Sequence, residues 1–288
     1  MSILVCDTDC ELWYTTAAEL GVKVIPMPYT VDGVEKMYDL GENTDFKAFY
    51  AGMRAGSAVS TSGLNKSVYT EIFRPWFEAG EDILYIAFSS KMSNTFEPLA
   101  AAIADLEKEF PKARYRKFDT LNICLGAGIM VYMAAKFFAG CGGDIDATYD
   151  YLESIVQKVC VQFVVGDLRY LARGGRLSPA KARMGNVLQA KPVLHVDREG
   201  EISVLTKVIG AKKAMSFVAS EFASKYRPTD GAPVYIVGAD CDDLVEQLKE
   251  RIAEIAPAAE IVTQPVGPVI GAHCGPGTYG IIYTADER

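Results

Sequence analysis

Histidine is scarce in this sequence, with only His195 and His273 among 288 residues. Because histidine is the side chain whose charge changes nearest neutral pH, few candidates exist for general acid–base catalysis. The sequence also has no Gly-x-Ser-x-Gly nucleophile elbow, no P-loop and no set of kinase motifs. We therefore expect no phosphoryl transfer by this chain alone, while a triad of Ser93, His273 and a distant carboxylate stays open.

Long hydrophobic runs and an excess of basic residues are also missing. Apolar stretches such as residues 83–88 are too short to span a bilayer, and the N-terminus enters a strand-like segment at residues 3–6 without a signal peptide. The 29 Lys and Arg residues are outnumbered by 37 Asp and Glu, and the net charge of −8 argues against nucleic acid or an anionic membrane as the main partner. We expect a cytoplasmic protein with no nucleic-acid partner and no stable membrane insertion.

The seven cysteines follow no disulfide framework, because their number is odd and their spacings are irregular. Cys6 and Cys10 lie close in sequence, but no second pair of Cys or His completes a tetrahedral zinc site. We expect reduced cysteines that pack as small apolar residues, and no metal or other cofactor.

Strand-like and helix-like segments alternate through the first half of the chain. Apolar runs such as residues 3–6 and 83–88 are followed by segments with helical spacing, which predicts a parallel sheet with helices on both faces. A glycine cluster at residues 140–143 marks the clearest break, and beyond it hairpins and helices both join the strands. We expect an α/β protein of two domains. Residues 1–155 form a three-layer α/β/α domain with a mainly parallel sheet, and residues 156–288 a two-layer α/β domain with a mixed sheet.

Three local signals predict individual turns and helix ends. The pair Asp32-Gly33 predicts a hairpin turn. Asn94, with Glu97 three residues later, predicts the cap of a helix that starts near residue 95. The pair Ser178-Pro179 predicts the start of a helix that runs to residue 189.

The C-terminal segment 266–283 is the most unusual stretch, with five glycines and two prolines around His273. Glycines at this density allow tight turns and a close approach of the backbone to a ligand. The flanking apolar pairs 269–270 and 281–282 are predicted to be buried strand. This arrangement is typical of the rim of a site.

Two earlier loops, residues 60–63 and 89–95, carry hydroxyl groups between a predicted strand and a predicted helix. Loops at the carboxyl ends of strands gather over one crevice, where helix N-termini attract anions. Each hydroxyl on its own is as well explained as a helix cap. Because the hydroxyls exceed capping needs, we expect both loops to converge with His273 on one small anionic group. The candidate donors in the loops are Thr61, Ser62, Ser93 and Asn94.

Two arginines flank a Gly-Gly turn in residues 170–178. Arginine can hold a carboxylate or phosphate through two parallel hydrogen bonds, or it can pair with acidic groups of the protein and so clamp the turn. For Arg173 the sequence favours neither interpretation, whereas for Arg176 it favours the clamp.

A competing enzymatic interpretation comes from the N-terminal strand, which ends in Asp7-Thr8-Asp9. An Asp-x-Asp after a strand resembles the first motif of haloacid-dehalogenase-type phosphatases, which implies Asp7 as phosphoryl acceptor, Asp9 as general acid and magnesium beside them. Glu11 stands where that family expects Thr or Val, and the later acidic segment 238–243 is a loose match to its metal-binding motif.

Five segments, in order along the whole chain, resemble the DegV family of bacterial fatty-acid-binding proteins, which includes the binding subunits of a two-part fatty acid kinase. The segments are residues 59–63, 89–96, 170–178, 191–194 and 271–277. The resemblance implies a non-catalytic carrier of a long-chain fatty acid such as hexadecanoate. The acyl chain would lie buried between two α/β domains, and its carboxylate would be presented to a separate kinase that makes the acyl phosphate.

By position, Thr61 and Ser93 match the family's carboxylate-binding residues, and His273 matches the histidine of its His-x-Gly-Pro-Gly segment. Ser62, Asn94 and Arg173 are weaker candidates for the fatty-acid site. The first loop departs from the family, since Gly-Leu-Asn follows Thr-Ser where Gln-Pro-Ser is usual. Residues that could form apolar walls, or serve only as core, are Phe163, Val165, Met184, Leu188 and Leu194.

Overall fold

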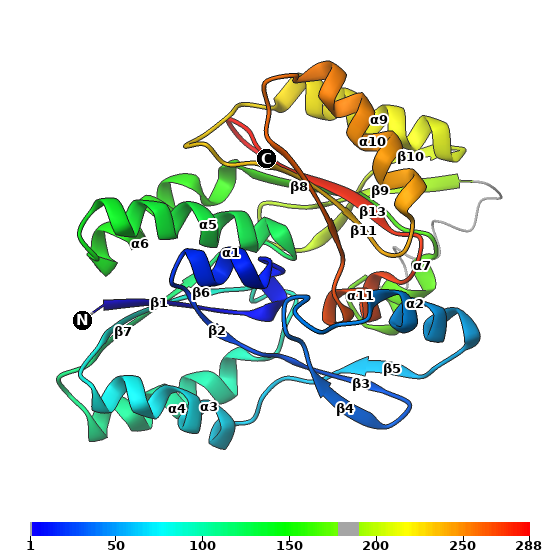
Figure 1. Cartoon of the computed structure of the whole chain (residues 1–288). Coiled ribbons are helices and arrows are strands. Elements are labelled where there is room, and N and C mark those ends of the chain that lie inside the picture. Colours follow the sequence, from blue (N-terminus) through cyan, green and yellow to red (C-terminus); the bar gives the residue numbers. More distant parts are fainter. Residues whose placement is uncertain (1, 178–189) are drawn as a thin grey trace.

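The computed structural model describes residues 2–177 and 190–288, which form three β-sheets with helices around them (Figure 1). The first sheet is fully parallel, in the order β2-β1-β6-β7. Its central strands are apolar on both faces, as expected where helices cover both sides, and the charged strand β7 suits the edge. The strands are β1 (Ser2–Asp7), β2 (Lys23–Ile25), β6 (Asp82–Ala87) and β7 (Arg114–Asp119). The predicted parallel sheet is confirmed.

The second large sheet has six strands of mixed direction, in the order β10-β9-β8-β13-β11-β12. Strands β11 and β12 pair in parallel, and the other neighbouring pairs are antiparallel. The strands are β8 (Val159–Val164), β9 (Ala190–Val196), β10 (Ile202–Ile209), β11 (Val234–Gly238), β12 (Ile261–Pro265) and β13 (Tyr279–Thr284). The predicted mixed sheet is also confirmed.

A third, small antiparallel sheet, β4-β3-β5, was not predicted as a separate sheet. It consists of β3 (Pro28–Val31), β4 (Val34–Met37) and β5 (Val59–Thr61). The predicted hairpin turn is confirmed, since Asp32 and Gly33 join β3 to β4 and both have positive φ, 50° and 83°. Glycine suits this position because it has no Cβ to oppose a positive φ. Thr61 is the last residue of β5, which lies at one edge of this sheet.

Helix α5 (Leu125–Gly140) lies between the two large sheets and contacts β6, β8 and β13 (Figure 1). Its residues are apolar almost all round, which is typical of a helix buried on every side. Helices α3 (Lys66–Glu78) and α4 (Phe96–Glu109) cover the opposite face of the first sheet, and α9 (Ala211–Lys225) and α10 (Asp242–Ile255) cover the outer face of the six-stranded sheet. The remaining helices are η1 (Thr8–Cys10), α1 (Tyr14–Glu19), α2 (Phe46–Ala55), α6 (Ile145–Ile155), η2 (Val156–Lys158), α7 (Leu168–Arg173) and α11 (Pro268–Cys274). Among the described helices, none has the length and apolarity needed to cross a bilayer.

Two short helices were not predicted. Residues 269–270, predicted as strand, lie in α11, which begins at Pro268, where the missing N–H of proline leaves no hydrogen bond unmade. Helix α7 precedes the Gly-Gly turn, and Asp167 caps it by accepting a hydrogen bond from the Arg169 N–H.

Helix α4 also starts differently from the prediction. Its cap position is Thr95, with no side-chain cap hydrogen bond, so the prediction that Asn94 caps this helix is wrong. The helix predicted from residue 179 to residue 189 lies outside the described residues. The domain boundary after residue 155 stays a prediction.

Candidate functional site

A cavity of about 520 Å³ lies between the loops that follow β1 and β6 and the inner face of the six-stranded sheet. In the parallel sheet the chain passes from β1 to β2 on one side and later returns to β6 on the other side of β1. The carboxyl ends of β1 and β6 therefore form a topological switch point, where the following loops diverge and leave a crevice. The cavity volume is in the range of ordinary small-molecule sites.

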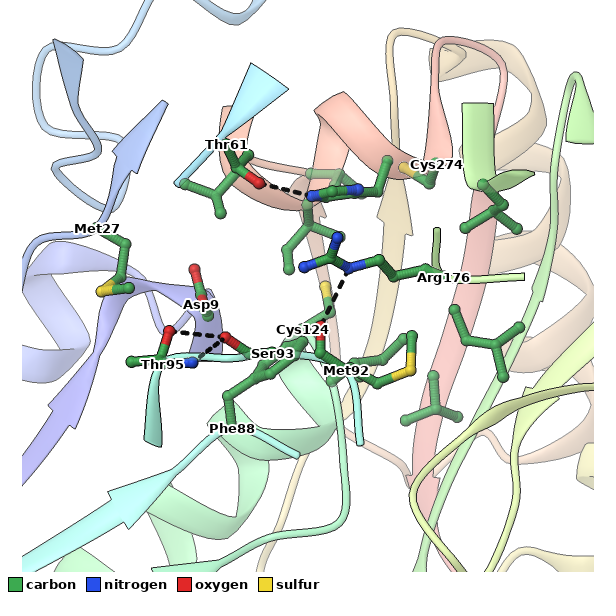
Figure 2. A pocket seen from close by; sticks show the side chains of 18 of the residues that line it. Asp9, Met27, Thr61, Phe88, Met92, Ser93, Thr95, Cys124, Arg176 and Cys274 are labelled. Carbon is green, nitrogen blue, oxygen red and sulfur yellow. Dashed lines mark hydrogen bonds between the residues drawn. The ribbon is translucent and has the colours of Figure 1, made fainter. Parts of the chain in front are cut away.

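Helix α11 brings His273 to Thr61, as the sequence predicted. It packs against β5, whose last residue is Thr61, and the Thr61 Oγ1 lies 2.8 Å from the His273 Nε2 (Figure 2). A glycine at position 271 lets α11 approach Tyr50 of α2, because a Cβ there would lie 2.5 Å from the Tyr50 Oη. The His273 Nδ1 is buried and has no hydrogen-bond partner among the described residues. Among the described residues, the ring therefore makes its hydrogen bond through Nε2, to Thr61.

The two hydroxyl loops meet at the same end of the cavity. A Cβ on Gly63, in the first loop, would lie 3.2 Å from the Thr95 Oγ1 in the second loop. The Ser93 Oγ lies 2.7 Å from this Thr95 oxygen (Figure 2). Ser62 and Asn94 also line the cavity but are exposed, which places them at its rim. All five predicted Thr, Ser, Asn and His residues therefore line one cavity, and Thr95 joins them as a hydroxyl that the sequence did not single out.

Of the two arginines that flank the Gly-Gly turn, Arg176 lines this cavity and Arg173 does not. The Arg176 Nε donates to the Met92 carbonyl at 3.0 Å (Figure 2). Its Nη1 donates to the Gly174 carbonyl at 2.6 Å, so Arg176 clamps the turn through backbone carbonyls and not through the acidic groups that were predicted. The same guanidinium lines the cavity, which gives the polar end a positive charge. Arg173 is exposed, lies over the Tyr170 ring and lines a separate surface depression.

Asp9 is a second cavity residue that was not predicted for an anion site. It is 7% exposed, and its Oδ1 is buried without a hydrogen-bond partner among the described residues. Figure 2 shows its carboxyl group pointing into the cavity between Thr61 and the Ser93–Thr95 pair. Burial raises the pKa of Asp9 well above its ordinary value, and the negative charges of Asp7 and Glu11 raise it further.

The phosphatase interpretation finds no support in this arrangement. Asp7 is 3% exposed, is not among the residues that line the cavity, and accepts hydrogen bonds from the Tyr85 hydroxyl and, at 3.0 Å, from the Asp9 N–H. A phosphoryl acceptor has to reach its substrate. Across residues 2–177 and 190–288, no group of three His, Cys, Asp or Glu side chains is placed to hold a metal ion. Asp240, from the loose acidic motif, forms an ion pair with Arg54.

Away from the polar end, the cavity walls are apolar. Side chains of the six-stranded sheet form one wall, and the start of α5 forms another. Of the predicted wall residues, Phe163 lines the cavity, Val165 and Leu194 are buried elsewhere in the core, and Met184 and Leu188 lie outside the described residues. The main apolar lining residues are Ile123, Val161, Phe163, Leu171, Ile202, Val237, Val269, Ile270 and Ile282. One polar end and long apolar walls suit an elongated amphiphile.

The His273 ring is held as a neutral imidazole. Burial lowers its pKa from 6.5 to about 4, and the nearby charges of Arg176 and Arg173 lower it further. A Cβ on Gly174 would lie 2.2 Å from the His273 Nδ1, although the Gly174 backbone itself is ordinary, with φ −74°. We therefore expect Gly174→Ala to displace the ring from Thr61 and to move the His273 pKa from about 4 towards the ordinary value of about 6.5.

NMR titration of the two histidine rings measures this change, and a His195→Gln variant assigns the signals. The matched control is Gly140→Ala, since a Cβ at this helical glycine would meet nothing within 4 Å. Gly140→Ala should leave the His273 titration unchanged. An unchanged pKa in Gly174→Ala would show that the ring does not depend on this contact.

Comparison with known proteins agrees with this geometry. The sequence model of the DegV family, described as uncharacterised proteins, matches residues 2–286. A DegV domain-containing protein from Clostridium perfringens is 32% identical over 286 residues, which cover 99% of this chain and 98% of that protein. The solved structure of a DegV family protein from Thermus thermophilus, described as fatty-acid binding, has a TM-score of 0.83 and 28% identity, with 98% of this chain and 99% of that chain covered. The structure of DegV from Bacillus subtilis, described as a fatty acid binding protein, has a TM-score of 0.82 and 26% identity, with 99% of each chain covered. The chain belongs to the DegV family.

Proposed function

We propose that this protein binds one long-chain fatty acid, with the carboxylate at the polar end of the cavity and the acyl chain along its apolar walls. The observation that carries the proposal is the meeting of Thr61, Ser93, His273 and Arg176 at one end of an otherwise apolar cavity. Hydroxyl groups and a guanidinium are donors that suit a carboxylate. The fatty-acid binding described for the Thermus and Bacillus relatives supports the same ligand class. Ser62 and Asn94 would contact the head group at the rim of the cavity. Arg173 lies outside the cavity and would not contact the ligand.

The acyl chain would supply most of the binding free energy. A hexadecanoyl chain buries roughly 14 methylenes at ~0.8 kcal/mol each, a gross gain of about 11 kcal/mol before the ordering of the chain is subtracted. Such a ligand would survive purification. We place the protein in the cytoplasm, because seven cysteines, an odd number at irregular spacings, are typical of reduced thiols.

Mass spectrometry of the purified protein tests the proposal, first in the native state and then after extraction with organic solvent. A stoichiometric mass increment that resolves into long-chain fatty acids is the expected result. Purified protein that carries no lipid and also fails to take up added fatty acid would contradict the proposal.

The double variant Thr61→Ala with Ser93→Ala should retain far less fatty acid. Each hydroxyl would donate a hydrogen bond to a charged carboxylate, worth about 1.5–3 kcal/mol, so we expect a loss of affinity of about 100-fold or more. The matched control is Thr70→Ala with Ser154→Ala, whose hydroxyls donate only to carbonyls of their own helices. Equal lipid content in the two double variants, at unchanged thermal stability, would rule out the assigned head-group residues.

The protein would act as a non-catalytic subunit that presents the carboxylate to a separate kinase. The sequence has no P-loop for ATP, and the exposed residues Ser62 and Asn94 mark where the polar end meets the surface. Loaded protein with ATP and magnesium should form no acyl phosphate alone and should form it when a purified fatty acid kinase subunit is added. Trapping with hydroxylamine measures the acyl phosphate as a hydroxamate.

A further inference from the structure

Asp9 places a second carboxyl group at the end of the cavity where the ligand carboxylate would bind. It follows β1, is 7% exposed and points into the cavity between the two hydroxyl loops (Figure 2). Its Oδ1 has no hydrogen-bond partner among the described residues, although it is buried. A buried polar atom without a partner is unfavourable unless a ligand or solvent completes its bonding.

Among residues 2–177 and 190–288, the charges around Asp9 do not balance two ionised carboxylates. On its own segment lie Asp7 and Glu11, both acidic and both acting on its ionisation. Arg176 is the cation that acts on it from the turn after α7, and Tyr69 faces it from α3 as a phenol whose pKa lies above its ordinary value because of burial. On the other described elements of the cavity, the titratable groups are His273, which is neutral near pH 7, and the thiols of Cys124 and Cys274, whose pKa values burial raises.

We propose that Asp9 and the carboxyl group of the bound fatty acid share one proton, so that the site binds the ligand in a proton-coupled way. One carboxyl group donates a hydrogen bond to the other, and the pair carries a single negative charge opposite Arg176. If Asp9 is ionised in the empty site, the shared proton comes from solvent. If Asp9 is protonated in the empty site, it already carries the proton that is shared. This inference rests on the proposed function and adds to it the protonation state in which the head group is held.

Proton sharing sets the sign of the pH dependence. Raising the pH removes the shared proton and places two negative charges beside each other, so affinity for a fatty acid falls as pH rises. Above the pKa of Asp9 in the empty site, binding takes up one proton per ligand, and the dissociation constant rises tenfold per pH unit. A fatty alcohol with the same chain brings no second charge, so its affinity does not fall in this way.

The test compares the wild-type protein with Asp9→Asn, which keeps the shape and supplies a fixed hydrogen-bond donor. Both are freed of bound lipid and titrated with dodecanoate and with 1-dodecanol by calorimetry between pH 6.5 and 9.5. In this range the free dodecanoate is fully ionised. Glu11 also ionises within it, with a pKa raised to about 8 by burial, but Glu11 is present in both proteins. Repeating the titration in buffers of different ionisation enthalpy counts the protons taken up.

For the wild type we expect dodecanoate to bind at least tenfold more weakly at pH 9.5 than at pH 6.5, with uptake approaching one proton at pH 9.5. For Asp9→Asn we expect a change of less than threefold, no proton uptake, and tighter binding than the wild type at pH 9.5. Equal pH profiles in the two proteins, or a wild-type profile that is flat for dodecanoate, would overturn the inference. If neither protein binds dodecanoate or dodecanol at any pH, the proposed function itself has failed.

Discussion

Replacing Arg176 by alanine is expected to lower the affinity for dodecanoate by at least 100-fold. Arg176 lines the polar end of the cavity beside Thr61 and His273, and its guanidinium is half-buried. Removing one partner of a buried ion pair costs about 3–5 kcal/mol, because the other charge stays buried without compensation. Calorimetric titration with dodecanoate measures the change directly.

A neutral ligand separates loss of charge from loss of shape. Arg176 also donates to the Met92 and Gly174 carbonyls, so the variant loses two contacts that hold the cavity wall. If charge is the cause, Arg176→Ala should weaken the binding of 1-dodecanol by less than about tenfold while dodecanoate binding falls much further. An equal fall for both ligands would mean that the variant has deformed the cavity and that the arginine does not recognise the carboxylate.

Arg173→Ala is the matched control, since Arg173 lies on the same turn but lines the outer depression. Its removal should change dodecanoate affinity by less than about threefold, because an exposed charge outside the cavity is well screened. A loss of 100-fold in Arg173→Ala together with little loss in Arg176→Ala would reverse the assignment of the two arginines.

The alternation of strands and helices could be predicted because each element is long enough to show its periodicity. The parallel and mixed sheets follow from it, and so does the Asp32-Gly33 hairpin, whose residue types suit two positive φ angles. The short helices α7 and α11 could not be predicted in this way, since six or seven residues give fewer than two turns of a period. Pro268 was the available signal for α11, because proline favours the first helical turn.

The hydroxyls and His273 could be predicted because their segments stand out in composition. Arg176 and Asp9 could not, for different reasons. The Arg176 backbone contacts match a clamp, and only the tertiary structure shows that the same guanidinium faces the cavity. Asp9 belongs to an Asp-x-Asp segment, and which of its two carboxyl groups faces the cavity depends on the turn of η1 after β1.

Loss of the Glu11 side chain should destabilise the fold strongly. It is 0% exposed, and its Oε2 accepts hydrogen bonds from the Gly267 N–H at 2.8 Å and the Tyr38 hydroxyl at 3.2 Å. Its backbone carbonyl accepts a third from the Gln264 side chain at 2.6 Å. Glu11 therefore joins the end of β1 to the segment before α11. Glu11→Ala leaves two buried donors unpaired, and we expect a loss of about 2–5 kcal/mol in the free energy of unfolding.

The variant Glu11→Gln separates this hydrogen bonding from the charge. Burial raises the pKa of Glu11 from 4.5 to about 8, so the folded chain holds a proton that the unfolded chain releases once the pH exceeds 4.5. Stability from this group is therefore fully present below pH 4.5 and is lost as pH rises through 8. The loss is at most about 5 kcal/mol. Gln keeps an acceptor oxygen for Gly267 and cannot ionise.

Guanidinium unfolding of the wild type, Glu11→Gln and Glu11→Ala at pH 5, 7 and 9 measures these effects. Other buried acids, such as Asp7 with a pKa raised to about 6, also titrate in this range, but they are common to all three proteins. The difference in unfolding free energy between the wild type and Glu11→Gln therefore measures the effect of Glu11 ionisation. Relative to the wild type, the variant should become more stable from pH 5 to pH 7 and again from pH 7 to pH 9. Glu11→Ala should be the least stable at pH 5, where the wild-type group is protonated and its Oε2 accepts both hydrogen bonds. If Glu11→Gln loses stability with rising pH as steeply as the wild type, Glu11 does not carry its proton in the folded chain, and its burial does not set the pH dependence of stability.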